Sequence, residues 1–165
     1  MPIIILILSL FLLPPIVPAT TLQPQQLTAV NENELLKSLK EGHIIVFGHE
    51  PSNQRLASAW AHVGLENGQG AKVYNYNLGN IGGSKNEPYF FIGGHPFKAN
   101  ASVIDGSILY WKTIKKMCYS VLPHFDVGSS KSAAYQLYRC GYYRADRETY
   151  AKIMSQLYWK AIKMF

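Results

Sequence analysis

One carboxylate, Glu66, stands in a stretch of the chain that is otherwise almost free of charge. Residues 61–82 read AHVGLENGQGAKVYNYNLGNIG, and Lys72 is the other residue there with a formal charge. An apolar repeat before Glu66 predicts a helix that stops near residue 67 or 68. The negative pole of that helix disfavours an anion in its last turn, and partial burial would disfavour it too. Both effects raise the pKa of a carboxyl group, and a retained proton is what a general acid needs.

The residues that follow Glu66 suit a sugar as the partner of this acid. Glycines 68 and 70 allow close approach of a backbone. The asparagines and tyrosines of residues 74–80 supply amide and hydroxyl groups together with aromatic rings. A glycosidic oxygen is a leaving group that an acid of this kind protonates. The alternative interpretation is a solvated glutamate at a helix end, with tyrosines that only fill the core.

The remaining reactive residue types show no pattern of their own. The five histidines have no metal-ligand spacing, so we predict no metal site and no cofactor. We expect His43 and His49 on the surface, and Trp60 and Trp111 in the core rather than as sugar platforms. Two cysteines, at positions 118 and 140, either pair in an exported protein or stay as buried thiols.

The chain is basic overall, but its basic residues are not concentrated in one stretch. The formal net charge is +6 over 165 residues. A basic surface favours anionic partners such as a bacterial wall. Because no block of consecutive basic residues is present, we do not expect nucleic-acid binding.

The chain begins with an apolar leader. The run from Ile3 to Leu13 is about eleven residues long, whereas a spanning helix needs roughly 20. We therefore interpret residues 1–19 as a cleaved signal peptide or, alternatively, a membrane anchor. Residues 20–31 are polar and read as a linker, which leaves residues 32–165 as one domain. Contact with a membrane is expected only through the leader.

The elements that would position Glu66 are mostly helical. Apolar residues at helical spacing, preceded by capping residues such as Asn31 or Asn33, Ser52, Ser102, Ser130 and Asp146, predict five helices. These helices cover about residues 34–41, 53–67, 103–119, 131–140 and 147–165, and Gly42 is the expected stop of the first. Residues 43–48 fit either a short strand or a helical turn. Residues 71–100 form a loop or a short hairpin, with Tyr89–Ile92 as its best strand. The sequence thus predicts a mainly α single domain with a loop-rich or β-hairpin middle.

Three motifs in this order resemble peptidoglycan hydrolases of the glucosaminidase type, glycoside hydrolase family 73 of the lysozyme-like superfamily. A helix in that family ends in a pattern like Ala-Leu-Glu-(Ser/Thr)-Gly-x-Gly, which is similar to residues 63–70 here. The family's Asn-Asn-(Leu/Val)-x-(Gly/Asn)-Ile resembles residues 75–81, and its Gly-Tyr-Tyr-Thr-Ala-Asp-Pro form resembles residues 141–151. The resemblance covers roughly residues 34–160. Gln69 replaces a frequent Trp or Arg, and Arg147 replaces the common Pro.

The resemblance implies a lysozyme-like fold and roles for individual residues. Glu66 would be the general acid. Tyr142 or Tyr143 matches the motif tyrosine, with Tyr143 the one assigned to catalysis, and helix-entry packing is the alternative role for Tyr143. The residues expected to bind substrate are Gln69, Tyr76, Asn77 and Tyr142.

A second catalytic group is not fixed by the resemblance. The carboxylates available are Glu87, Asp105, Asp126 and Asp146, of which Glu87 is preferred because Asp105 and Asp146 suit helix starts. Alternatively, the N-acetyl group of the substrate assists, or the sugar's own hydroxyl attacks and leaves an anhydro product.

The implied partner is the glycan strand of peptidoglycan. The implied location is exported: periplasmic, secreted or anchored to the envelope, or in the virion if a phage encodes the protein. Muramidase or lytic transglycosylase action on the same substrate stays open, as does a wall-binding module without turnover. A membrane-anchored helical domain that binds another protein is a further alternative. The sequence assigns no oligomeric state.

Overall fold

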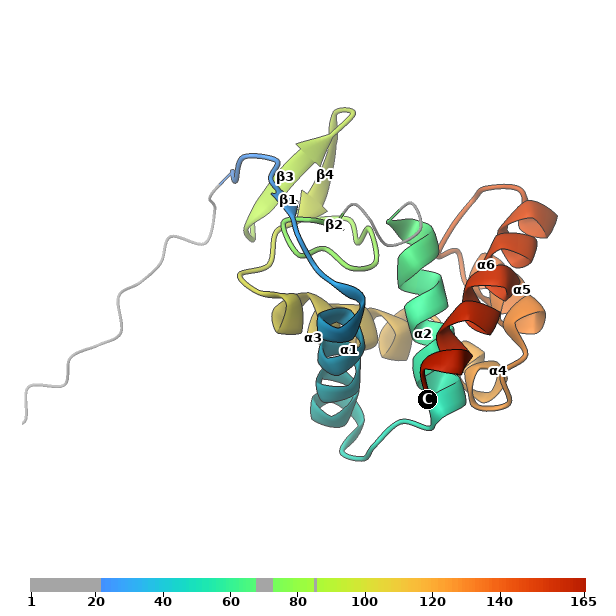
Figure 1. Cartoon of the computed structure of the whole chain (residues 1–165). Helices are drawn as coiled ribbons and strands as arrows, with labels where there is room; N and C mark the ends of the chain where they lie inside the picture. The colour runs from blue at the N-terminus through green and yellow to red at the C-terminus, as the bar shows by residue number, and fades with distance from the viewer. Residues whose placement is uncertain (1–21, 68–72, 85) are drawn as a thin grey trace, which may run out of the picture.

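A computed structural model describes residues 22–67, 73–84 and 86–165 of the chain. Within these ranges the protein is mainly helical, with two small antiparallel sheets, which confirms the predicted fold class (Figure 1). The α-helices are α1 (Glu32–Phe47), α2 (Asn53–Glu66), α3 (Val103–Met117), α4 (Leu122–Asp126), α5 (Ser130–Arg139) and α6 (Arg147–Ala161), and the 3₁₀ turns are η1 (Tyr119–Val121) and η2 (Ile162–Met164). The strands are β1 (Leu27–Thr28) paired with β2 (Val73–Tyr74), and β3 (Tyr89–Ile92) paired with β4 (His95–Lys98).

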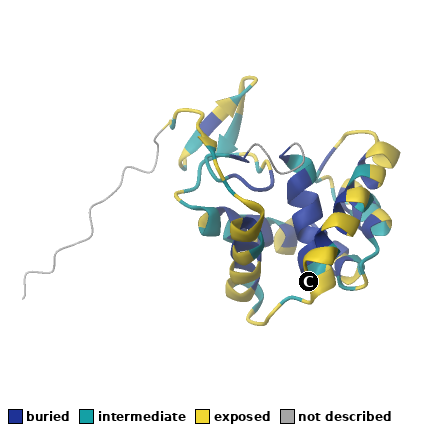
Figure 2. Ribbon diagram, viewed as in Figure 1, coloured by how far each residue is buried: buried dark blue, intermediate teal, exposed yellow. Residues whose placement is uncertain are grey.

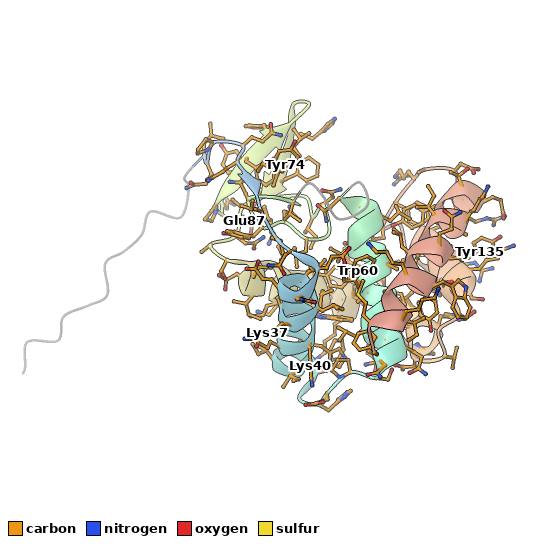
Figure 3. The ribbon with its side chains drawn as sticks, in the orientation of Figure 1. Lys37, Lys40, Trp60, Tyr74, Glu87 and Tyr135 are labelled. Carbon is orange, nitrogen blue, oxygen red and sulfur yellow. A yellow bond between two sulfur atoms is a disulfide. The ribbon has the colours of Figure 1, made fainter. Side chains whose placement is uncertain are left out.

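The helix α2 forms the centre of the helical body. Every residue from Leu56 to Gly64 is buried, and this helix is the most continuously buried ribbon in Figure 2. Three alanines in this stretch are small enough for α1, α4 and α6 to pack around the helix. Trp60 on α2 (labelled in Figure 3) and Trp111 on α3 are 1% and 0% exposed, and their burial confirms both as core residues.

Side-chain caps define where four of the helices begin. Asn31, Ser52, Ser102 and Asp146 each accept a hydrogen bond from the backbone N–H three residues later, at 2.8–3.2 Å. These caps satisfy amides that a helix start leaves without partners. The predicted cap of α5 is wrong. Ser130 is the first residue of the helix, and no side chain caps it.

The first helix is longer than predicted. It runs through Gly42 and ends at Phe47, where Gly48 has a positive φ of 79°. Gly42 faces α3 so closely that a Cβ there would lie 2.6 Å from Ser107 Oγ. The glycine therefore serves the contact between two helices and does not stop the first.

The extension of α1 also corrects the prediction for His43. This side chain is fully buried, not on the surface, while His49 is exposed as expected. The ring Nδ1 of His43 bonds the backbone carbonyl of His49 at 3.0 Å, and Arg55 Nη1 donates to its Nε2 at 3.0 Å. Burial is the main reason that the pKa of His43 falls to about 4.

The segment read as a linker is attached to the sheets in its described part. Leu27 and Thr28 pair with Tyr74 and Val73, and the amide of Gln23 bonds the carbonyl of Tyr89 at 2.8 Å. A polar composition is compatible with an edge strand, which exposes most of its side chains. The predicted leader, residues 1–19, lies outside the described residues. No helix among the described residues is long and apolar enough to cross a membrane.

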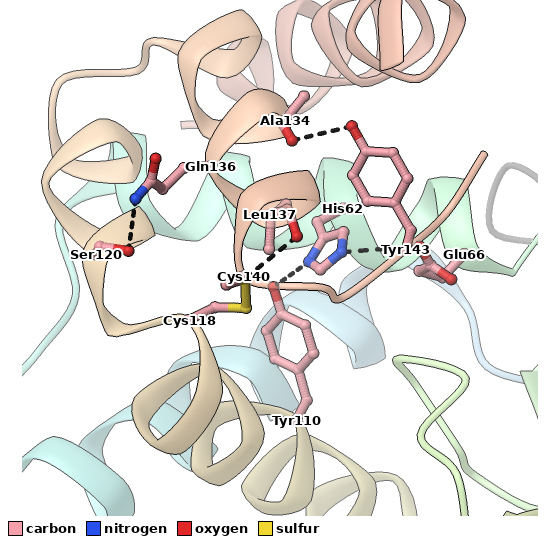
Figure 4. The surroundings of a disulfide bond; sticks show 10 residues. All are labelled: His62, Glu66, Tyr110, Cys118, Ser120, Ala134, Gln136, Leu137, Cys140 and Tyr143. Atoms are coloured by element: carbon pink, nitrogen blue, oxygen red, sulfur yellow. Dashed lines mark hydrogen bonds and ion pairs between the residues drawn. A yellow bond between two sulfur atoms is a disulfide. The ribbon is translucent and has the colours of Figure 1, made fainter. Parts of the chain in front are cut away.

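A disulfide joins the ends of two helices. Cys118 follows α3 and Cys140 follows α5, and the two Cα atoms lie 5.4 Å apart (Figure 4). The alternative of two buried free thiols is therefore wrong. The bond closes a loop between residues 22 apart in sequence and holds α5 against the end of α3.

Replacing both cysteines by alanine should lower the free energy of unfolding by about 3 kcal/mol, because the unfolded chain regains the freedom that the loop closure removes. Urea unfolding of the wild type and of the Cys118→Ala/Cys140→Ala variant measures this difference. Reductant should shift the wild-type midpoint and leave that of the variant unchanged. Coincident wild-type curves with and without reductant would contradict a stabilising bond.

Candidate active site

Glu66 lies in the last turn of α2, as predicted, and is the last residue of that helix. The side chain is 14% exposed although it carries a carboxyl group. The next residue, Asn67, donates from Nδ2 to the carbonyls of Val63 (2.9 Å) and Leu78 (2.6 Å). These bonds tie the end of the helix to the loop after β2 and fix the position from which the carboxyl group projects.

Two side chains donate hydrogen bonds to Glu66. The Tyr150 hydroxyl, on α6, donates to Oε1 at 2.5 Å. The Asn80 amide lies 3.5 Å from Oε2 and also donates to the backbone carbonyl of Glu66. Burial raises the pKa of Glu66, while the bonds from Tyr150 and Asn80 oppose this rise because they stabilise the carboxylate. The balance favours the protonated acid more than in water.

His62 lies one helical turn before Glu66 and does not supply a compensating charge. Its ring is fully buried, and burial lowers its pKa to about 3, so it is neutral near pH 7. The Nε2 atom lies 3.8 Å from Glu66 Oε1, and Nδ1 lies 2.9 Å from the Tyr110 hydroxyl (Figure 4). Nε2 has no hydrogen-bond partner in the described part of the chain. A neutral imidazole therefore faces the acid.

Tyrosines form the rest of the wall around this group. The ring of Tyr142 meets that of His62 edge-on at 4.6 Å, and its hydroxyl donates to the carbonyl of Gly79 at 2.9 Å. Burial raises the pKa of Tyr110, Tyr142 and Tyr150, and the charge of Glu66 adds to the rise. These phenols hence remain protonated and act as hydrogen-bond donors, not as bases. Beside them, Asn80 and Tyr142 line a cavity of about 110 Å³.

Tyr143 is near the site but is engaged elsewhere. Its hydroxyl donates to the carbonyl of Ala134 at 3.0 Å. Its ring stacks on Tyr150 with centroids 3.5 Å apart and planes 6° from parallel. Burial is the first cause of the rise in its pKa to about 12. In this arrangement Tyr143 orients Tyr150, and Tyr150 contacts the acid.

The structure does not bring the other described residues predicted to bind substrate together at Glu66. Asn77 is buried, and its amide holds the loop by bonding Ile81 (2.8 Å both ways) and the carbonyl of Lys98 (3.0 Å). Tyr76 belongs to a separate pocket described below. Gln69 lies outside the described residues. Tyr142 is thus the one of the four with a described contact to the Glu66 neighbourhood.

All ten aspartate and glutamate side chains of the sequence fall within the described ranges, and they include the four candidates for a second acid. Glu87 lies in the segment before β3 (Figure 3). It pairs with Lys98, the last residue of β4, at 2.6 Å. Asp126 pairs with Arg55 at 2.5 Å, and Asp105 accepts from the Ser102 hydroxyl at 2.7 Å. Asp146 caps α6. Each of the four candidates is held by a partner other than Glu66.

Sequence reasoning missed three residues that contact Glu66. Tyr150 stands at an apolar position of the last helix, where a buried ring is expected for packing alone. His62 stands four residues before Glu66, a spacing that places two side chains on one helix face, so it could have been found. Asn80 had no such signal because the path of a loop decides its position. No group of three or more metal-binding side chains gathers within the described residues.

The raised pKa of Glu66 has a consequence for stability. In the unfolded chain a glutamate has a pKa of roughly 4.3, and in the folded chain the pKa of Glu66 is higher. Its contribution to stability is therefore complete below the unfolded pKa and is lost as the pH rises through the folded pKa. Relative to wild type, Glu66→Gln should become progressively more stable over this range, as urea unfolding at a series of pH values will show. A stability difference that does not change between pH 4 and pH 8 would contradict the shift.

Comparisons of this chain with protein-family models, with curated proteins and with solved structures found no match.

Proposed function

We propose that this protein is a glycosidase that cleaves the N-acetylated glycan strand of bacterial peptidoglycan, with Glu66 as general acid. The observation that carries the proposal is a largely buried carboxyl group whose pKa is raised and whose two described donors, Tyr150 and Asn80, are neutral. The motif order that resembles family 73 hydrolases supports the choice of substrate. A lysozyme-like fold and export from the cell belong to the same proposal. The disulfide agrees with an oxidising compartment.

The contacts of the carboxyl group suggest how the proton is held. Oε1 accepts the hydrogen bond of Tyr150, which leaves Oε2 as the oxygen that carries the proton in the resting acid. Transfer of this proton to the glycosidic oxygen leaves a carboxylate. The bonds from Tyr150 and Asn80 strengthen as this negative charge develops, so they stabilise the transition state more than the ground state.

The engagement of the other carboxylates favours a reaction with a single protein acid. A retaining or inverting pair needs a second carboxylate beside the scissile bond. Glu87, the preferred candidate in the sequence, is already paired with Lys98. The electron-poor sugar carbon is then captured by the substrate's own N-acetyl oxygen, followed by water, or by its own hydroxyl, which gives an anhydro end. The anhydro route would make the protein a lytic transglycosylase.

Glu66→Gln should reduce release of fragments from purified peptidoglycan by roughly a hundredfold or more, because the amide cannot donate the proton. Mass spectrometry of the released muropeptides measures the rate and identifies reducing or anhydro ends. The sugar that carries the new end distinguishes glucosaminidase from muramidase action. Glu87→Gln is the matched control and should keep most of the activity. No fragments from wild type would overturn the enzymatic proposal, and equal losses in both variants would restore a two-carboxylate mechanism.

Tyr150→Phe should change the pH dependence of the same reaction. The hydrogen bond from Tyr150 lowers the pKa of Glu66, so its removal raises that pKa. Activity depends on the protonated acid, so the alkaline limb of the rate profile should move to higher pH while the maximal rate falls about tenfold or more.

The control for Tyr150 is Tyr143→Phe. Its hydroxyl bonds Ala134, not Glu66, and the stacked ring is kept in the variant. The alkaline limb should then stay in place. A Tyr150→Phe profile that superimposes on wild type after scaling would show that the bond does not tune the acid.

A further inference from the structure

A second pocket, of about 340 Å³, lies on the side of β1 and β2. Its walls come from three residues of the N-terminal segment, from the loop after β2, and from the segments before β3 and after β4: Gln23, Gln26, Thr28, Asn75, Tyr76, Pro88 and residues 99–101. None of these residues is among the described contacts of Glu66. The volume is within the range of small-molecule sites, roughly 300–1,000 Å³.

Backbone and amide hydrogen bonds hold the walls of this pocket in place. Asn75 joins two walls, since its Oδ1 accepts from the amide of Gln26 at 2.9 Å and its Nδ2 donates to the carbonyl of Pro24 at 3.1 Å. Its backbone carbonyl accepts from the amide of Asn100 at 2.9 Å, and Asn100 Nδ2 donates to the carbonyl of Tyr76 at 3.2 Å. A pocket tied in this way is formed before a ligand arrives, which reduces the cost of binding.

The chemistry of the lining is neutral and rich in carboxamides. Among the described residues that line it, none carries a charge, although the chain as a whole has a net charge of +6. The neighbouring charge of Lys98 is already paired with Glu87. A phosphate or carboxylate ligand would find no cation in these walls.

The groups left free in the pocket are those that a sugar uses. The side-chain amides of Gln23 and Gln26 form no hydrogen bond with the described part of the chain, and each can both donate and accept. Tyr76 adds a half-buried aromatic residue to the wall. Pro88, Ala99 and Ala101 add small apolar surfaces that suit the C–H face of a ring or an acetyl methyl group.

We propose that this pocket is a second carbohydrate site, which binds a neutral N-acetylated sugar unit separately from the acid at Glu66. The loop from β2 to Ile81 contributes Asn75 and Tyr76 to the pocket and Asn80 to the carboxyl group, so one loop serves both places. Binding here requires no turnover. The pocket would hold one part of a glycan strand while another part of the strand reaches the acid. The pocket would bind sugar even if Glu66 catalysed nothing.

The test uses the full chain with Glu66→Gln as background, so that the probe is not cleaved. Triacetylchitotriose is titrated and followed by calorimetry and by amide shifts in NMR spectra. Shifts should appear at residues 23–28, 75–76 and 99–101. Adding Gln23→Leu and Gln26→Leu should weaken binding at this site at least tenfold, because the free amides are lost while side-chain size is nearly kept.

Gln25→Leu is the matched control, because Gln25 is exposed between the two and does not line the pocket. It should bind like the background protein, and unchanged thermal unfolding should confirm that all variants fold. Cellotriose, which lacks acetamido groups, should bind more weakly.

The proposal is overturned by shifts confined to Asn80, Tyr142 and Tyr150, by unchanged affinity in the double variant, or by no binding at all. Sugar binding in this pocket by a protein that releases no muropeptides would uphold this site and reject the proposed enzyme.

Discussion

The burial of α2 along most of its length is the constraint on which the site depends. Because α1, α4 and α6 surround this helix, its last residue projects into protein and not into bulk water. A carboxylate placed there loses hydration, and the resulting cost raises the pKa of Glu66. A helix of the same sequence on the surface would carry an ordinary glutamate. The chemical character of the acid is therefore a consequence of packing.

The same burial determines the residues that can surround the acid. A buried polar group without a partner costs free energy, so the hydroxyls of Tyr110, Tyr142 and Tyr150 each bond a specific atom. His62 stays neutral for the same reason, since protonation inside the core would leave an uncompensated charge. The result is a carboxyl group with a neutral donor on each oxygen and, among the described residues, no cation paired with it. A salt bridge there would have lowered the pKa of Glu66 instead of allowing it to rise.

The loop after β2 connects this site to the rest of the small sheets. Three of its residues that are not glycine, Asn75, Tyr76 and Asn80, have φ values of 47–51°. Asparagine tolerates this left-handed conformation better than most residues, whereas for tyrosine it is unusual. Asn77 fixes the turn from within, through its bonds to Ile81 and Lys98. The shape of the loop delivers Asn80 to the acid and Tyr76 to the neutral pocket.

The sequence by itself determined five of the six described α-helices, most of their starts and the position of Glu66 at a helix end, because caps and apolar spacing act over a few residues. The short helix α4 was not predicted. Local signals failed where a distant element decided the outcome. Gly42 looks like a stop until Ser107 is seen against it, and His43 looks exposed until α1 is extended past it. Only the tertiary structure decided that Tyr150 contacts Glu66 across 84 positions, that Tyr143 supports Tyr150, and that Glu87 is occupied by Lys98. Such partnerships depend on how whole helices and loops meet, and that information is spread over the entire chain.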